Sequence, residues 1–182
     1  MDNTKRVFTP LGTEQLLIGW LIHSHKARDR HDEAARRYAK GQFVLGIPSL
    51  IASTIVGTAV FTAMEATKDQ PPELWVGLLS ILAAVLVALQ TFMDFGGRSD
   101  KHRNAAVKYK SSIRLLEESI VRQQTQGSGL THDEIATIRT TLDSLEESAP
   151  VVMPKIYGEV EKKYQDMKYV SEAIGLYTKQ LE

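Results

Sequence analysis

The residues with the most chemical potential occur in one pattern that appears twice in the chain. The two copies of H-x-x-A-A-x-x-Y consist of His31, Ala34, Ala35 and Tyr38, and of His102, Ala105, Ala106 and Tyr109. Positions i, i+3, i+4 and i+7 share one face of a helix, so each copy places an imidazole, two small side chains and a phenol together. Two such faces packed antiparallel predict close contact at the alanines and hydrogen bonds between His and Tyr across the seam.

Two imidazoles on facing helices also suggest a metal site or a pH-sensitive contact. The sequence places no carboxylates where they would aim at the same point as His31 and His102. We therefore interpret the pair as a structural hydrogen-bonding element and expect no metal.

Sequence motifs for catalysis are missing from the chain. It has no Cys, and no G-x-S-x-G or H-E-x-x-H motif. Gly127-Ser128-Gly129 lacks the third glycine and the following Lys of a phosphate-binding loop. The formal net charge is zero, from 22 Lys+Arg and 22 Asp+Glu, so no basic field attracts nucleic acid. We expect no enzyme activity, no catalytic residues, no cofactor and no direct binding of nucleic acid.

The repeats flank two long stretches without charge, at residues 43–64 and 74–93. As helices these would be about 33 and 30 Å long, close to the roughly 30 Å hydrocarbon core of a bilayer. We predict two transmembrane helices. The alternative is a pair of buried core helices, which a chain of 182 residues has little other apolar surface to cover.

The charges beside these stretches predict their orientation. Six cations lie within residues 26–40, before the first stretch, and six within residues 98–114, after the second, whereas the loop at residues 65–73 carries only Lys68. By the positive-inside rule both termini are cytoplasmic and the loop lies outside. The lipid bilayer is the expected partner of these two helices.

Small and polar side chains within the stretches predict helix packing and a polar path. The helix-packing candidates are Ser49, Ser53 and Gly57 in the first stretch and Ser80, Ala84 and Ala88 in the second. The candidates for lining a pore are Thr54, Thr58, Thr62 and Gln90. The alternative for the threonines is that each hydroxyl bonds only its own i−4 carbonyl. Pro48 removes a backbone donor and is the candidate hinge.

The remaining sequence predicts an all-α protein, a two-helix transmembrane hairpin whose long helices extend into a cytoplasmic bundle. Residues 1–42 form an amphipathic helix, residues 94–126 a helix packed on it with a coiled-coil-like seam, and residues 127–182 further helices. The last helix has an apolar face at Val160, Tyr164, Met167, Val170, Ile174, Tyr177 and Leu181.

Two segments carry a resemblance to a known family. Gly46-Ile47-Pro48, Ser53, Gly57 and Phe61 resemble the first span of the SLATT family, two-span effector domains associated with bacterial nucleotide-signalling proteins. The second span is similar at L-Q-T-F-x-x-F in residues 89–95, followed by K-H-R-x-A-A-x-x-Y in residues 101–109. The resemblance implies an effector of an anti-phage conflict system, which assembles on a nucleotide signal or a partner protein. It also implies a location in the bacterial inner membrane, which the effector permeabilises to kill the infected cell. The chain has no segment resembling the sensor domains fused to many members, so sensing is expected from a partner or from the C-terminal helices.

Two functions follow. The first is a homo-oligomeric effector that forms a pore or channel and kills the infected cell. The second is a membrane-anchored scaffold whose cytoplasmic helices dock a signalling partner, without a pore.

Overall fold

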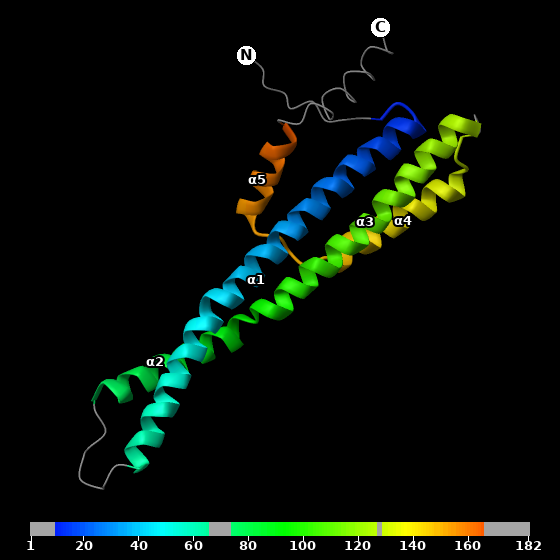
Figure 1. Cartoon of the computed structure of the whole chain (residues 1–182). Helices are drawn as coiled ribbons and strands as arrows, with labels where there is room; N and C mark the ends of the chain where they lie inside the picture. The colour runs from blue at the N-terminus through cyan, green and yellow to red at the C-terminus, as the bar shows by residue number, and fades with distance from the viewer. Residues whose placement is uncertain (1–9, 66–73, 127–128, 166–182) are drawn as a thin grey trace, which may run out of the picture. The chain divides into compact units, whose positions relative to one another are not determined.

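The chain is helical throughout the part that its structure, a computed structural model, describes. That part is residues 10–65, 74–126 and 129–165, except for the side chains of 61–65, 74, 126 and 165. It contains no strand and five helices: α1 (Thr13–Glu65), α2 (Leu74–Met93), α3 (Phe95–Gln126), α4 (His132–Ser148) and α5 (Pro154–Gln165) (Figure 1). The prediction of an all-α fold with two long apolar helices in a hairpin-like arrangement is confirmed. The expected loop at 65–73, apart from Glu65 at the end of α1, and the apolar face from Met167 onward lie outside the described residues.

The chain divides into two compact units. The first, which we call the helical bundle, combines Met1–Ala34 with Lys101–Glu182, and the second, the apolar hairpin, is Ala35–Asp100. Both α1 and α3 contribute residues to each unit. The sequence predicts separate segments at 1–42 and 43–64, whereas α1 continues without a break from Thr13 to Glu65 and through Pro48.

The helical bundle has a core where α1, α3 and α4 meet. Leu17 and Leu116 are fully buried and Ile138 is nearly so, and these three side chains form one cluster. Tyr109 and Leu145 pack with Ala27 in a second cluster. The colours of Figure 1 show that α3 runs antiparallel to both α1 and α4.

Local sequence explains where the last two helices of the bundle begin. Thr131 and Glu134 form a capping box, in which the Glu134 backbone N–H donates to Thr131 and the Glu134 carboxylate accepts from the Thr131 backbone N–H. Pro154 occupies the first position of α5, where its missing N–H costs nothing. Ile156, Val160 and Tyr164 of α5 are buried against Ala34 of α1.

The seam predicted along α3 is used inside the bundle. His102, Ala106, Tyr109, Ile113 and Leu116 are all buried, at no more than 5% exposed. Since these residues are covered within one chain, they are not an exposed surface on which a second copy could dock.

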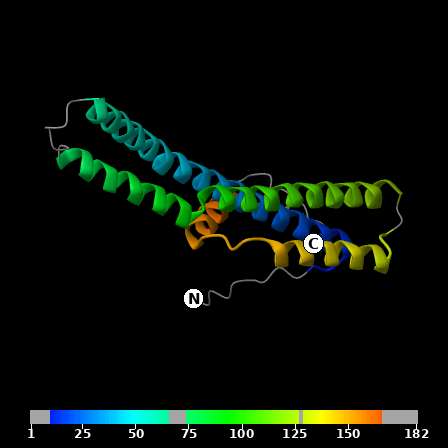
Figure 2. The same cartoon turned by 90° about the horizontal axis from the view of Figure 1, so that it is seen from below.

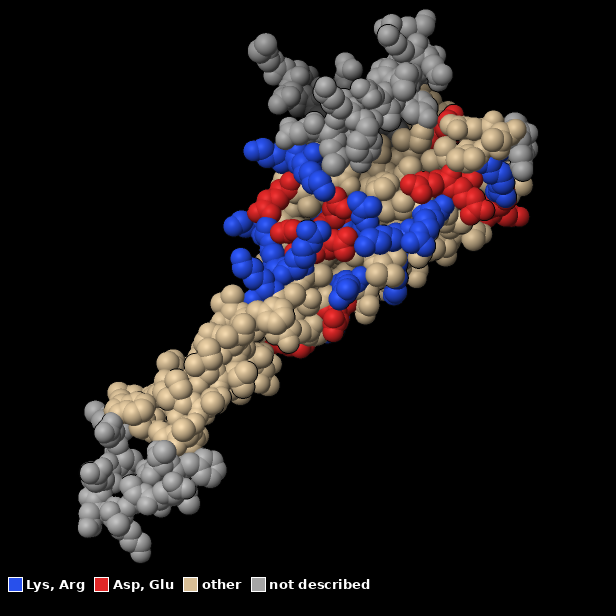
Figure 3. Space-filling model, viewed as in Figure 1, with Lys and Arg blue, Asp and Glu red and all other residues tan. Residues whose placement is uncertain are grey.

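The apolar hairpin exposes its side chains instead of burying them. In each long helix we consider the 18 consecutive residues with the highest hydropathy. Only 11% of this segment is buried in the first helix, and only 6% in the second. Exposed side chains include Leu50 at 68% and Phe92 at 83%. Figure 2 shows α1 and α2 as antiparallel arms, and Figure 3 shows a long surface of the hairpin without charge. Both helices are long and apolar enough to cross a membrane.

The packing of the bundle core predicts that two adjacent leucines contribute very differently to the free energy of unfolding. Leu116→Ala removes a fully buried side chain and should lower the free energy of unfolding by about 2–5 kcal/mol. Leu115, its neighbour, is 39% exposed, and Leu115→Ala should cost less than about 1 kcal/mol. Denaturant unfolding in detergent micelles, followed by circular dichroism, measures both. Equal losses would contradict the packing of α3 described above.

Candidate functional site

Two of the predicted threonines lie on the outer surface of the hairpin. Thr54 and Thr58 are exposed, and their hydroxyls donate to the backbone carbonyls of Leu50 and Thr54, at 2.8 and 2.9 Å. These are the i−4 bonds that the sequence allows. The side chain of Thr62 lies outside the described residues.

Gln90 occupies a different place from the threonines. Its side chain is half-buried against α1, where Ser49 Oγ lies 3.5 Å from Gln90 Oε1 and donates to the Gly46 carbonyl at 3.0 Å. A Cβ on Gly46 would lie 3.3 Å from Gln90 Nε2, so the absence of a side chain at Gly46 allows this approach. Within one chain, therefore, Gln90 does not share a face with Thr54 and Thr58.

The small residues of the first stretch are divided between two faces of α1. Ser49 is buried at 4% exposed, as is Ala52 at 6%, and these residues form the face toward α2. Ser53 is exposed, and nothing lies within 4 Å of a Cβ built on Gly57. Packing within the hairpin therefore uses Ser49 and leaves Ser53 and Gly57 available.

On α2, packing within the hairpin does not use two of the three helix-packing candidates. Ala83 is buried at 6% exposed, whereas the predicted Ala84 and Ala88 are exposed. Ser80 is half-buried and donates to the Val76 carbonyl at 2.8 Å. The candidate hinge Pro48 is exposed in the continuous helix α1.

The junction of α2 and α3 is a capped break that the sequence analysis did not predict. Asp94 has φ of 44°, a left-handed conformation that ends α2, and its carboxylate accepts from the Gly97 N–H at 3.1 Å to cap α3. A Cβ at Gly97 would lie 2.5 Å from this carboxylate, which explains the glycine. The Asp-x-x-Gly spacing of Asp94 and Gly97 is the feature of the sequence that could have indicated this cap.

The hairpin is closed tightly beside this junction. The Phe95 ring lies so near α1 that a Cβ on Gly41 would be 2.9 Å from it. Ser99 Oγ donates to the Ala35 carbonyl at 2.9 Å. The ring centroids of Tyr38 and Phe95 lie 6.4 Å apart. The Arg98 guanidinium lies over the Tyr38 ring, 5.9 Å from its centroid. The first repeat's Ala35 and Tyr38 thus contact the start of α3.

The remaining members of the repeats meet in the bundle, with a geometry that differs from the predicted one. His31 Nδ1 and His102 Nδ1 lie 2.9 Å apart in a buried hydrogen bond. His31 stacks on Tyr109, with ring centroids 5.6 Å apart and an interplanar angle of 18°. Ala34, Ala105 and Ala106 are buried, as close helix packing requires. The predicted hydrogen bonds between His and Tyr are thus replaced by a hydrogen bond between the two imidazoles and by stacking of His31 on Tyr109.

Burial sets the charge of this cluster. Burial lowers the pKa of His31 most, and electrostatic repulsion by His102 and Arg30 lowers it further, from 6.5 to about 4. Burial also lowers the pKa of His102, and burial together with Glu146 and Tyr157 raises the pKa of Tyr109 to about 12. All three groups are therefore neutral at neutral pH, and the cluster acts as a structural element.

A cleft of about 280 Å³ adjoins the His31–Tyr109 stack. Its charged groups already have partners within the chain: His23 Nε2 lies 2.6 Å from Glu146, and Arg30 contacts Glu161 at 3.3 Å and the Tyr157 ring at 3.9 Å. No group of three His, Asp or Glu side chains in the described residues is placed to hold a metal ion. The guanidinium charge of Arg30 is thus paired with Glu161, while its buried Nε has no hydrogen-bond partner in the structure.

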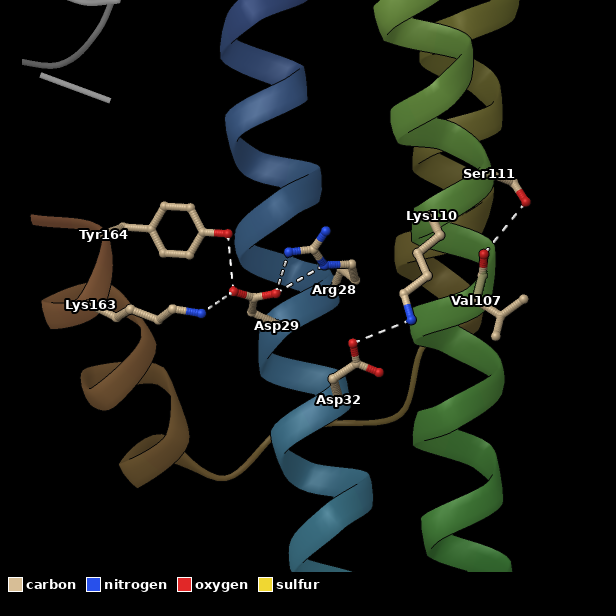
Figure 4. Close-up of polar contacts among 8 residues, drawn as sticks. All are labelled: Arg28, Asp29, Asp32, Val107, Lys110, Ser111, Lys163 and Tyr164. Carbon is tan, nitrogen blue, oxygen red and sulfur yellow. Dashed lines mark hydrogen bonds and ion pairs between the residues drawn. The ribbon is translucent and has the colours of Figure 1, made fainter. Parts of the chain in front are cut away.

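Ion pairs hold α5 against α1, an arrangement that the sequence analysis did not predict. Asp29 accepts from Arg28, from Lys163 Nζ at 2.8 Å and from the Tyr164 hydroxyl at 3.2 Å (Figure 4). Burial alone would raise the pKa of Asp29, but the hydrogen bonds from Lys163 and Arg28 lower it. Asp29 is thus a charged anchor for α5. Partners 134 residues apart leave no local signal in the sequence.

Comparisons of the chain with family models, with curated proteins and with solved structures found no match.

The histidine pair predicts a pH dependence of stability. Between pH 6.5 and about 4 the unfolded chain binds a proton at His31 that the folded chain does not. The stabilisation is therefore complete above pH 6.5 and is lost as the pH falls, by about 1–2 kcal/mol at pH 5. His31→Gln should flatten this slope, whereas His132→Gln, on the exposed start of α4, should leave it unchanged. Unfolding titrations at pH 7, 6 and 5 measure the slopes, and identical slopes in all three proteins would refute the assignment.

Proposed function

We propose that the chain is a two-span protein of the bacterial inner membrane that assembles with copies of itself into a pore or channel. The observation that carries this proposal is the outer surface of the hairpin, where large apolar side chains lie exposed beside the two hydroxyls of Thr54 and Thr58. A bilayer supplies the apolar surroundings that such a surface needs. The cations on both flanks support placing both termini in the cytoplasm.

The faces of the hairpin support a ring with α1 inside and α2 outside. Thr54 and Thr58 lie about half a turn around α1 from Ser49 and Ala52, which face α2. If the threonines face the axis of a ring, α2 lies behind α1 and meets lipid. The exposed side chains of α2 suit lipid contact, since its large ones include Leu78, Ile81 and Val85.

Ser53 and Gly57 suit the contact between neighbouring copies. They lie about a quarter turn from the threonine face, on a flank of α1 that the hairpin itself does not use. Small residues four apart let two helices approach closely in a membrane. Because the seam of α3 is buried within the bundle, this flank of the hairpin is the proposed site of assembly.

The biological role in the proposal rests on the sequence. The resemblance to the SLATT family supports an effector that kills the infected cell in an anti-phage or other conflict system. It also implies a trigger, either an upstream signalling protein or a nucleotide second messenger.

One observation favours a second candidate, a membrane-anchored scaffold without a pore. The hydroxyls of Thr54 and Thr58 are bonded to their own helix, and such threonines can face lipid without an unsatisfied donor. In this case the bundle would dock a partner and the hairpin would be an anchor.

Substitution of one threonine distinguishes the two candidates. Thr58→Leu replaces the hydroxyl by an apolar side chain on the proposed pore face and should lower ion flux through liposomes several-fold. Thr91→Leu is the matched control, because Thr91 is also exposed and donates to its own i−4 carbonyl at 2.9 Å, but lies on α2. The scaffold is favoured if the assembled wild-type protein passes no ions under any trigger. It is also favoured if Thr58→Leu and the wild type give equal ion flux.

A second pair of variants tests the assembly surface. Gly57→Val should leave the hairpin intact, because nothing lies within 4 Å of the added Cβ, but should shift the protein toward monomers. Gly77→Val on α2 has equally open space and should leave assembly unchanged. Cross-linking in liposomes reports the oligomeric state. Normal oligomers of Gly57→Val would exclude this flank as the contact between copies.

A further inference from the structure

We propose that the face of α1 turned away from α2 binds an anionic phospholipid. Arg36 and Lys40 would hold the headgroup phosphate, and the acyl chain would lie along Phe43 and Ile47. This inference rests on the proposed insertion of the hairpin into a bilayer. The four residues lie on the same face of α1 as Thr54 and Thr58, so the lipid belongs to the unassembled hairpin, and a ring with the threonines at its axis would have to release it.

The spacing of these four residues places them in one stripe. They are separated by four, three and four positions, which is one face of a helix, and this face lies about half a turn from the buried Ser49. Arg36 and Lys40 are exposed, and Phe43 and Ile47 are 65% and 53% exposed. The stripe therefore offers two cations that continue directly into apolar surface.

The distances suit a single lipid molecule. Residues four apart on a helix have Cβ atoms about 5–6 Å apart, so both cations can reach one phosphate. At a rise of 1.5 Å per residue, Lys40 lies about 4–5 Å and Arg36 about 10 Å below Phe43 along the axis. The headgroup layer on each side of a bilayer is about 5–8 Å thick, and long cationic side chains extend into it.

The charges of the hairpin favour an anion on this face. Among the described residues neither Arg36 nor Lys40 forms an ion pair. The Asp94 carboxylate is engaged as the cap of α3.

A lipid fits the stripe better than a free phosphate. A free phosphate would satisfy the two cations and leave Phe43 and Ile47 exposed. A phospholipid covers both parts, since its phosphate and its acyl chain are joined at the boundary where the stripe changes from charged to apolar.

Native mass spectrometry of the full chain, delipidated in detergent and titrated with phosphatidylglycerol or phosphatidylcholine of equal acyl chains, tests the proposal. The wild type should bind phosphatidylglycerol more tightly. Each cation near a membrane surface contributes roughly fivefold, so Arg36→Gln/Lys40→Gln should weaken phosphatidylglycerol binding by about 30-fold and leave phosphatidylcholine binding unchanged. Inorganic phosphate at equal concentration should not displace the lipid.

The matched control is Arg139→Gln/Lys155→Gln, which removes the same charge from exposed positions of α4 and α5. It should bind phosphatidylglycerol like the wild type. Equal affinity for the two lipids, an equal loss in the control, or displacement by inorganic phosphate would overturn the proposal. Ion flux measured separately in liposomes distinguishes this failure from that of the pore, and a chain that stays in water without detergent would refute insertion itself.

Discussion

Most of the large apolar side chains that the structure describes in the hairpin are exposed, and the proposals about the protein depend on this constraint. Backbone groups of α1 and α2 are satisfied inside each helix, but two helices can cover only one face of each other. Ser49, Ala52 and Ala83 fill that shared face, while side chains such as Leu50 and Phe92 remain exposed. Lipid or further copies of the chain would suit these surfaces, because contact of apolar side chains with water is unfavourable.

The two units differ in how far their sequence predicts their packing. In the bundle, polar and apolar residues alternate with the helical period, so the buried face of α3 follows from the sequence, down to Leu116 and Tyr109. In the hairpin nearly every position is apolar, and the pattern defines the length of each helix but not its rotation. For this reason the sequence did not indicate that Ala83, one position before the helix-packing candidate Ala84, is the buried residue, and Gln90 was grouped with Thr54. A shift of one residue turns a helix face by about 100°.

Contacts between residues far apart in the chain were only partly predictable from the sequence. The repeats correctly indicate that His31 and His102 lie near each other, because both occupy small, close-packing helix faces. Beside α5, Asp29 contacts Lys163 and Tyr164, and Glu161 contacts Lys26. The four charged residues are ordinary surface charges in the sequence, and Tyr164 belongs to the predicted apolar face of the last helix. Only the packing of Ile156 and Val160 against Ala34 brings them together, so the ion pairs follow from the apolar contact.

The bonded hydroxyls of Thr54 and Thr58 are compatible with both candidate functions. A threonine hydroxyl has one donor and two acceptor lone pairs, and the bond to the i−4 carbonyl uses only the donor. Its oxygen can then face lipid, where no donor is left unsatisfied, or accept hydrogen bonds from water in a pore. The difference between the candidates lies in what surrounds this face. The open flank at Gly57 matters for that reason: a neighbouring helix packed there would turn the threonine face of α1 away from lipid and toward the axis of an assembly.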